Sequence, residues 1–297
     1  MSNPQITAIR QLLTENPIIQ PNATLDQMRA GMDAMGNATP ALSEVTTTQV
    51  NADGVDAYWV SANGKENGPV ILYFHGGGYV MGSALSHRAL IERLAVALGG
   101  RVLAINYRLA PEHPFPAACD DALTSYRWLL KQGIDPHNIA LAGDSAGGGL
   151  TVAALLAIRD GGDPLPACAS SISPWVDMEA LGESMLTKAP EDPMVQKAAL
   201  AMIAPLYLNG ADPRSPLAAP LYADLSGLPP VLIQVGSAET LLDDAKRLAG
   251  AIKQAGGQAD LEVWDEMIHV WHLFAPMLDK GQEAIEGMAA FMRGYLQ

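Results

Sequence analysis

Short apolar runs alternate with segments of helical periodicity along this chain, and this alternation constrains its fold more than any other feature. Several of the runs are continuously apolar, which is typical of central strands covered on both faces. Strand alternating with helix predicts an α/β fold with a mostly parallel sheet and helices on both faces. The earliest runs, separated by NGKENGP, predict an antiparallel edge. The predicted strands are VDAYWVSA, VILYFHGG, RVLAINYR, IALAGD, ACASSISPW, PVLIQVGS and LEVWDE.

Two regions depart from the alternation. Residues 1–45 contain helical patterns, and residues 180 to about 215 insert another helical stretch between two predicted strands. Helices inserted at the carboxyl edge of such a sheet often cover the ligand site. We therefore expect N-terminal cap helices in residues 1–45 and a catalytic domain in residues 46–297, with a cap insertion at about 180–215. Three methionines at helical spacing either line a pocket or pack in the core: Met28, Met32 and Met35.

Composition excludes several classes of function. Hydrophobic residues make up 49% of the 297 residues and charged residues 17%, which predicts a sizeable buried core. The net charge of −14 disfavours nucleic acids and anionic membrane surfaces as partners. Cys119 and Cys168 match no metal spacing and are interpreted as buried free thiols in a reducing compartment. With no signal peptide or membrane span in the sequence, we expect a soluble, cytoplasmic protein.

A serine lies in a tight turn between a predicted strand and a predicted helix. Gly143-Asp144-Ser145-Ala146-Gly147 fits G-x-S-x-G, the nucleophile elbow, in which small residues let strand and helix approach closely. The turn lifts the hydroxyl clear of the sheet, at the positive end of the following helix. A phosphate-binding loop is disfavoured, because the glycines match neither G-x-x-x-x-G-K-[ST] nor G-x-G-x-x-G. A purely structural turn remains the alternative until partners for Ser145 are found.

The first partner is the glycine loop HGGGYVMG at residues 75–82, directly after the predicted strand VILYF. A carbonyl under attack develops negative charge on its oxygen, and fixed backbone N–H groups stabilise that charge. Three successive glycines allow the backbone to come this close, and loops of the HGGG type form part of the oxyanion hole in hydrolases. Ala146, the residue after the serine, is expected to supply the other N–H.

The second partner is a carboxylate after a late strand, where Glu239, Asp243 and Asp244 are candidates. Thr240 followed by Asp243 resembles a capping box, which gives Asp243 a local role. Asp244 is predicted to lie on the solvated side of the helix. Glu239 lies at the carboxyl edge of the strand and is chosen as the catalytic acid, with Asp243 as the alternative.

The third partner is a histidine near the end of the chain. His269 lies in the loop after the strand LEVW, whereas His272 starts the next helical segment. A base must reach Ser145 from a loop at the top of the sheet, so His269 is predicted to be that base. The resulting order of Ser, acid and His along the chain matches that of α/β-hydrolases. The other histidines are interpreted as structural or surface groups, with the first bracing the glycine loop: His75, His87, His113 and His137.

From about residue 69 onward the sequence resembles the bacterial hormone-sensitive-lipase-like esterases of the α/β-hydrolase fold. The resemblance implies an eight-stranded sheet, a helical cap, Ser145 as nucleophile, His269 as base, and Gly77, Gly78 and Ala146 as the oxyanion hole. That family more often has Asp at the position of Glu239. The motifs that carry the resemblance are HGGGYVMGS, NYRLAPEHPFPAA, GDSAGG and PWVD, together with the segments around Glu239 and His269.

The predicted function is hydrolysis of carboxylic esters with short to medium acyl chains, through an acyl-enzyme intermediate. No metal or cofactor is implied, and the expected partner is a small-molecule ester. The same fold and triad also support amidases, lactonases and eliminating dehydratases. A binding protein or receptor on a hydrolase fold is the non-enzymatic alternative. The resemblance also allows a homodimer through the edge strand LEVW at residues 261–264.

Overall fold

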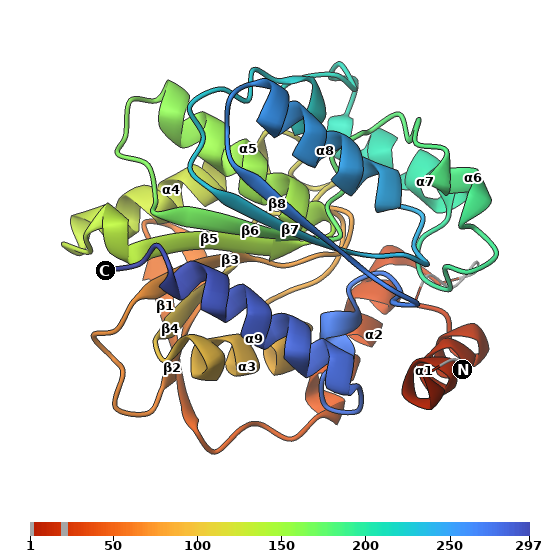
Figure 1. Ribbon diagram of the computed structural model, residues 1–297, viewed down its shortest axis with the longest axis horizontal. Coiled ribbons are helices and arrows are strands. Elements are labelled where there is room, and N and C mark those ends of the chain that lie inside the picture. The colour runs from red at the N-terminus through yellow and green to blue at the C-terminus, as the bar shows by residue number, and fades with distance from the viewer. Residues whose placement is uncertain (1–2, 19–22) are drawn as a thin grey trace.

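The computed structural model describes residues 3–18 and 23–297, and within these residues eight strands form one sheet (Figure 1). Their order is β1-β2-β4-β3-β5-β6-β7-β8. β2 runs antiparallel to β1 and to β4, and every later pair is parallel, which confirms the predicted fold class. The antiparallel edge was predicted from the two runs on either side of NGKENGP, but it is formed by β2 with β1, a strand that was not predicted, whereas β3 is a central parallel strand. The strands are β1 (Val45–Ala52), β2 (Val55–Ala62), β3 (Val70–Phe74), β4 (Arg101–Asn106), β5 (Ile139–Asp144), β6 (Cys168–Ile172), β7 (Val231–Gly236) and β8 (Ala259–Trp264).

Helices cover both faces of the sheet. Figure 1 shows α3 and α9 on one face and α4, α5 and α8 on the other. The helices are α1 (Pro4–Glu15), α2 (Leu25–Ala38), α3 (Arg88–Leu98), α4 (Ala117–Lys131), α5 (Ala146–Asp160), α6 (Ser184–Thr187), α7 (Lys197–Leu208), α8 (Leu242–Gln254) and α9 (Asp279–Arg293), with short 3₁₀ turns η1 (Pro136–Asn138), η2 (Pro220–Tyr222) and η3 (Trp271–Phe274).

The central strand β3 explains why both faces need covering. All five of its residues are buried, and successive side chains point to opposite faces. Leu72 and Phe74 pack in the core shared with α4, α5 and α8, whereas Ile71 and Tyr73 pack against α3 and α9. A strand that is apolar on both faces is stable only between two layers of helix.

Three strands end where the predicted site residues lie. β5 ends one residue before Ser145, β7 ends three residues before Glu239, and β8 ends five residues before His269. Because these strands are parallel, their carboxyl ends lie at one edge of the sheet. β6 is shorter than the predicted run ACASSISPW, since Ser173 has a left-handed backbone with a φ of 45° and a proline follows it.

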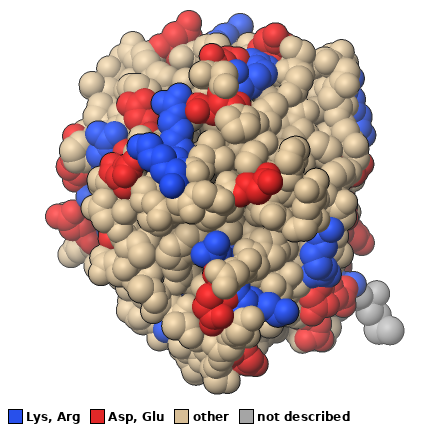
Figure 2. Space-filling model, turned by 90° about the vertical axis from the view of Figure 1, so that its left-hand side faces the viewer, with Lys and Arg blue, Asp and Glu red and all other residues tan. Residues whose placement is uncertain are grey.

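Four helices lie at this end of the sheet, on the right of Figure 1: α1, α2, α6 and α7. They fall in the two regions for which the sequence predicted a cap. Among the residues that the structure describes, no helix is both long and apolar enough to cross a membrane. On the face shown in Figure 2, Lys and Arg side chains lie beside Asp and Glu rather than in a continuous basic patch.

Candidate active site

Ser145 occupies a strained turn between β5 and α5. Its φ of 56° and ψ of −119° lie outside the regions that residues other than glycine usually adopt. The backbone is fixed on both sides, since the Ser145 N–H donates to Ile172 O at 2.8 Å and the Ser145 carbonyl accepts from Trp175 N at 3.0 Å. A Cβ at Gly147 would lie 2.0 Å from Phe74 O, so only glycine fits where helix and strand meet. The strand-turn-helix geometry predicted for an elbow is therefore present.

Glu239 and His269 form a buried pair after β7 and β8. The Nδ1 atom of His269 lies 2.8 Å from Oε2 of Glu239. The other carboxylate oxygen, Oε1, accepts from the backbone N–H of Gly236 at 2.5 Å and from the hydroxyl of Ser173 at 2.9 Å. Ser173 Oγ in turn accepts from the N–H of Val270 at 3.2 Å, which also ties the histidine loop to the carboxylate. The imidazole is thereby held with its second nitrogen available.

Burial and mutual charge set the ionisation of this pair. Burial lowers the pKa of His269, but the hydrogen bond and charge of Glu239 outweigh it and hold that pKa above its ordinary value of 6.5. Burial raises the pKa of Glu239, and the hydrogen bond and charge of His269 act against this rise. The carboxylate therefore favours the imidazolium that forms when His269 accepts a proton.

The other two carboxylates on this segment have different partners. Asp243 accepts from the backbone N–H of Ser184 at 2.9 Å, and the predicted capping box is wrong because α8 begins at Leu242 without a side-chain cap. The hydroxyl of Thr240 instead donates to Asp192 at 3.1 Å.

Asp244 was predicted to be solvated, but it is fully buried. One of its oxygens accepts from the N–H groups of Val176 and Asp177 at 3.1 Å each. The prediction failed because the loop that contains Val176 and Asp177 packs against this position of α8. Burial raises the pKa of Asp244 to about 7, and the nearby charge of Asp177 adds to the rise.

The glycine loop after β3 has a backbone that few other residues could adopt. Gly77 has a φ of 116° and Gly78 a φ of 64°, and a Cβ at Gly77 would lie 2.2 Å from Met81 O. The carbonyl of Gly77 accepts from Val80 N and Met81 N, which closes the loop on itself. Among the described residues, the N–H groups of Gly77 and Gly78 take part in no hydrogen bond. Both glycines are partly exposed and line the pocket, so their unpaired N–H groups are available to an incoming acceptor.

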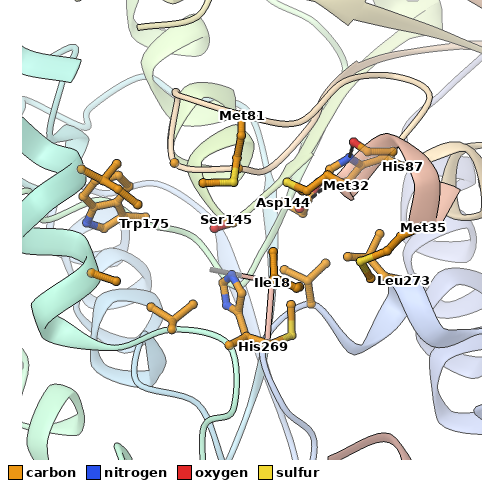
Figure 3. A pocket seen from close by; sticks show the side chains of 18 of the residues that line it. Ile18, Met32, Met35, Met81, His87, Asp144, Ser145, Trp175, His269 and Leu273 are labelled. Carbon is orange, nitrogen blue, oxygen red and sulfur yellow. Dashed lines mark hydrogen bonds and ion pairs between the residues drawn. The ribbon is translucent and has the colours of Figure 1, made fainter. Parts of the chain in front are cut away.

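One pocket brings these elements together. It is lined by Gly77, Gly78, Ser145 and His269, and in Figure 3 the imidazole of His269 points toward Ser145. Ala146 is buried at the first position of α5, where a helix leaves its N–H without an intrahelical acceptor. The rest of the wall is largely aliphatic or methionine side chains, including Ile18, Met32, Met35, Met194, Ile203 and Leu273.

Both alternatives for the methionines of α2 hold. Met32 and Met35 line the pocket, and Met28 and Met32 pack against the hydrophobic core. Within residues 3–18 and 23–297, no group of three or more His, Cys, Asp or Glu side chains is arranged to hold a metal ion.

Another buried carboxylate, that of Asp144, lies beside the serine. Asp144 accepts from the hydroxyl of Tyr73 at 2.6 Å and from the N–H of Gly76 at 3.0 Å, and its other oxygen lies 3.2 Å from Nε2 of His87. Burial lowers the pKa of His87, but the charge of Asp144 outweighs it and the pKa is raised. Nδ1 of His75 lies 2.7 Å from Gly76 O, in keeping with its predicted bracing of the glycine loop.

Sequence reasoning missed two residues of this site. Ser173, which contacts Glu239, follows an apolar strand and precedes a proline, and that placement at a strand end was the available signal. Asp192 is buried and accepts from the backbone N–H of Thr240 at 2.8 Å, directly after Glu239. Asp192 lies 47 residues before Glu239 in the chain, so no local pattern connects these two residues.

The chain is similar to known proteins over its whole length. A family model described as the alpha/beta hydrolase fold matches residues 71–273. An acetyl-hydrolase from Streptomyces hygroscopicus is 45% identical, over 99% of this chain and 97% of its own length. An esterase from Acinetobacter venetianus is 32% identical, over 92% of this chain and 90% of its own length. A crystal structure described as an esterase from the bacterial hormone-sensitive lipase (HSL) family has a TM-score of 0.97 and 49% identity, covering 100% of both chains. The similarity thus includes the N-terminal helices.

Proposed function

Because the chain belongs to the α/β-hydrolase family, among the esterases related to hormone-sensitive lipase, and is a carboxylic ester hydrolase, we propose that Ser145, His269 and Glu239 are its catalytic triad. The observation that carries this proposal is the 2.8 Å contact from His269 Nδ1 to Glu239, with the imidazole facing Ser145 in one pocket. A nucleophile, a base and a group that orients the base are the parts that acyl transfer through serine requires.

In the proposed mechanism, His269 takes the proton of the Ser145 hydroxyl as its oxygen attacks the ester carbonyl. Glu239 holds the imidazole with its proton on Nδ1 and stabilises the imidazolium. The negative charge on the carbonyl oxygen is taken up by the N–H groups of Gly77, Gly78 and Ala146. His269 then protonates the leaving alcohol, which departs and leaves the acyl group on Ser145. Water, activated by His269, attacks the acyl-enzyme and restores the free serine.

The proposed substrates are esters with short to medium acyl chains. The apolar wall of the pocket suits an uncharged acyl group, and one relative is named an acetyl-hydrolase. The helices α1, α2, α6 and α7 are proposed to form a cap that closes the pocket, since side chains from α2 and α7 line it. They correspond to the predicted cap in residues 1–45 and about 180–215.

The test is hydrolysis of p-nitrophenyl esters from acetyl to dodecanoyl by the unmodified protein and by Ser145→Ala. We expect turnover of the short chains, falling as the chain lengthens, and loss of at least about 10⁴-fold in the variant. A phosphonate that reacts with activated serines should label the unmodified protein at Ser145, as read by mass spectrometry. Equal turnover by Ser145→Ala, or labelling at another residue, would refute the triad.

We also propose a cytoplasmic location and a homodimer through β8. Cys119 and Cys168 are both free and buried, as suits a reducing compartment. β8 is the last strand of the sheet, so its outer edge is proposed to pair with a second copy, and Val263 on this strand is exposed. Sedimentation of the protein and of Val263→Lys would test the dimer, which should dissociate in the variant.

A further inference from the structure

Two polar side chains of α2 form hydrogen bonds with the segment that follows Gly77 and Gly78. Arg29 and Asp33 are four residues apart and so lie on the same face of the helix. Nε of Arg29 donates to the carbonyl of Val80 at 2.8 Å, and Oδ1 of Asp33 accepts from the hydroxyl of Ser83 at 2.5 Å. A helix that is distant in the sequence therefore fixes the C-terminal part of the glycine loop at two positions, Val80 and Ser83.

Arg29 also joins this loop to the next one. Its Nη2 donates to Ala110 O at 2.9 Å, and the N–H of Ala110 donates to Tyr79 O at 2.9 Å. The carboxylate of Glu112 binds both terminal nitrogens of the guanidinium, at 2.8 and 2.7 Å. A planar fork with several fixed donors can satisfy all three acceptors at once, which the ammonium of a lysine cannot do in the same geometry.

The loop needs external support because its own backbone is strained. Tyr79 has a φ of 63° directly after two glycines that also have positive φ, and this conformation is unfavourable for a residue other than glycine. Such a conformation persists only where the surroundings fix it. Here the ring of Tyr79 stacks on Tyr207 of α7, with 3.8 Å between ring centroids, and the carbonyls of Tyr79 and Val80 are held by Ala110 and Arg29.

We propose that Arg29 is a positioning residue for the oxyanion hole: through Val80 and Ala110 it keeps the N–H groups of Gly77 and Gly78 directed at the charge that develops on the substrate oxygen. This inference rests on the oxyanion role proposed above. Oxyanion-hole donors stabilise the transition state because they are fixed before the reaction begins. A loop that moves more freely would bind the neutral ester as before but would stabilise the oxyanion less.

The test compares Arg29→Met with Arg159→Met. Arg159 is a matched control, because its guanidinium also donates to two backbone carbonyls, those of Asp224 at 2.8 Å and Ser226 at 2.5 Å, and also binds a neighbouring carboxylate. It lies at the far end of α5 from Ser145. We measure kcat and KM for p-nitrophenyl acetate, and Ki for a trifluoromethyl ketone. Ser145 adds to the carbonyl carbon of that ketone, and the resulting oxyanion occupies the hole.

For Arg29→Met we expect kcat to fall about tenfold, since the donors are loosened rather than removed and removal costs about 10²–10³. KM should change less than about twofold, and Ki should rise by the same factor as kcat falls. Arg29→Lys should give a smaller loss, and Arg159→Met should match the unmodified enzyme in both kcat and Ki.

Two results would overturn the inference. One is an Arg29→Met enzyme whose kcat matches that of Arg159→Met. The other is a loss that appears in KM while Ki is unchanged, since this would mean a damaged pocket rather than a loosened hole. If Arg29→Met does not fold, the same readouts on Arg29→Lys decide the matter. Hydrolysis that survives Ser145→Ala would instead refute the proposed function, so the two failures are distinguishable.

Discussion

Replacing Glu239 by glutamine should nearly abolish hydrolysis, although it only exchanges one carboxylate oxygen for an NH₂ group. The reason lies in the fixed partners of its two oxygens. The N–H of Gly236 can only donate, and the hydroxyl of Ser173 donates to the same oxygen, Oε1. The amide oxygen of the glutamine therefore has to occupy the Oε1 position. Its NH₂ group then faces Nδ1 of His269, where Oε2 now lies at 2.8 Å.

An NH₂ group at that position reverses the polarity of the contact. Nδ1 of His269 must accept, so the imidazole carries its proton on Nε2 and cannot take the proton of Ser145. The equivalent change from carboxylate to amide in a serine protease triad lowers kcat by about 10⁴-fold, which corresponds to about 5.5 kcal/mol of barrier. We expect a loss of that size in kcat for p-nitrophenyl acetate. The folded state should persist, because the glutamine has nearly the same volume and its amide oxygen still accepts from Gly236 and Ser173.

The matched control is Asp243→Asn on the same segment. Among the described residues, the Asp243 carboxylate accepts only from Ser184 N, which an asparagine oxygen can also do, so activity should stay within about threefold of the unmodified enzyme. Circular dichroism spectra and unfolding midpoints of both variants should match those of the unmodified enzyme, which would exclude loss of fold as the cause of lost activity. A Glu239→Gln enzyme that keeps more than a tenth of the activity would refute this reasoning, as would an equal loss in Asp243→Asn.

Two further predictions concern pH and packing. Because Glu239 holds the pKa of His269 above 6.5 and the base must be neutral, kcat/KM should fall as the pH drops, with a midpoint above 6.5 in an ester assay; a lower midpoint would contradict the assignment. Gly147→Ala should destabilise the protein by about 3 kcal/mol or more, since its Cβ would lie 2.0 Å from Phe74 O. Gly250→Ala, with nothing within 4 Å in the middle of α8, should instead stabilise it by up to about 1 kcal/mol. Urea unfolding separates the two, and similar midpoints would show that packing at the elbow is not the constraint.

The sequence predicted those features that depend on local pattern. The order of strands and helices follows from hydrophobic periodicity, which local segments carry by themselves. The strained turn at Ser145 was visible because small residues must flank it, and Glu239 and His269 were visible because each follows a strand that ends at the same edge. Parallel topology then brings these residues together without further information.

Features that depend on packing between distant segments were not predictable. Asp244 looked solvated from the helical pattern, but it is buried and accepts from the backbone N–H of Val176 in a distant loop. Thr240 looked like a helix cap, but a carboxylate 48 residues earlier competes for its hydroxyl. The contact from Arg29 to Val80 joins residues 51 apart, and nothing in either local sequence marks it. In each case the deciding atom belongs to another part of the chain.

Buried carboxylates explain why the type and position of an acidic residue do not by themselves identify the catalytic acid. Loops at the carboxyl edge of the sheet bury backbone N–H groups that need acceptors, and carboxylates supply strong ones. An acid near a strand end is therefore first an anchor for a loop. The anchoring pairs are Asp144 with Gly76, Asp192 with Thr240, Asp244 with Val176, and Glu239 with Gly236.

Even contact with a histidine does not single out the catalytic acid, because Asp144 also lies 3.2 Å from an imidazole nitrogen, that of His87. The difference lies at the other nitrogen of each ring. Nδ1 of His87 is 2.8 Å from the hydroxyl of Ser86, so that ring is held at both ends. Within the described residues, His269 has a hydrogen-bond partner at Nδ1 alone, Glu239, and the residue lines the pocket beside Ser145. A base must keep one nitrogen free for the reaction, and of these two histidines His269 is the one placed to do so.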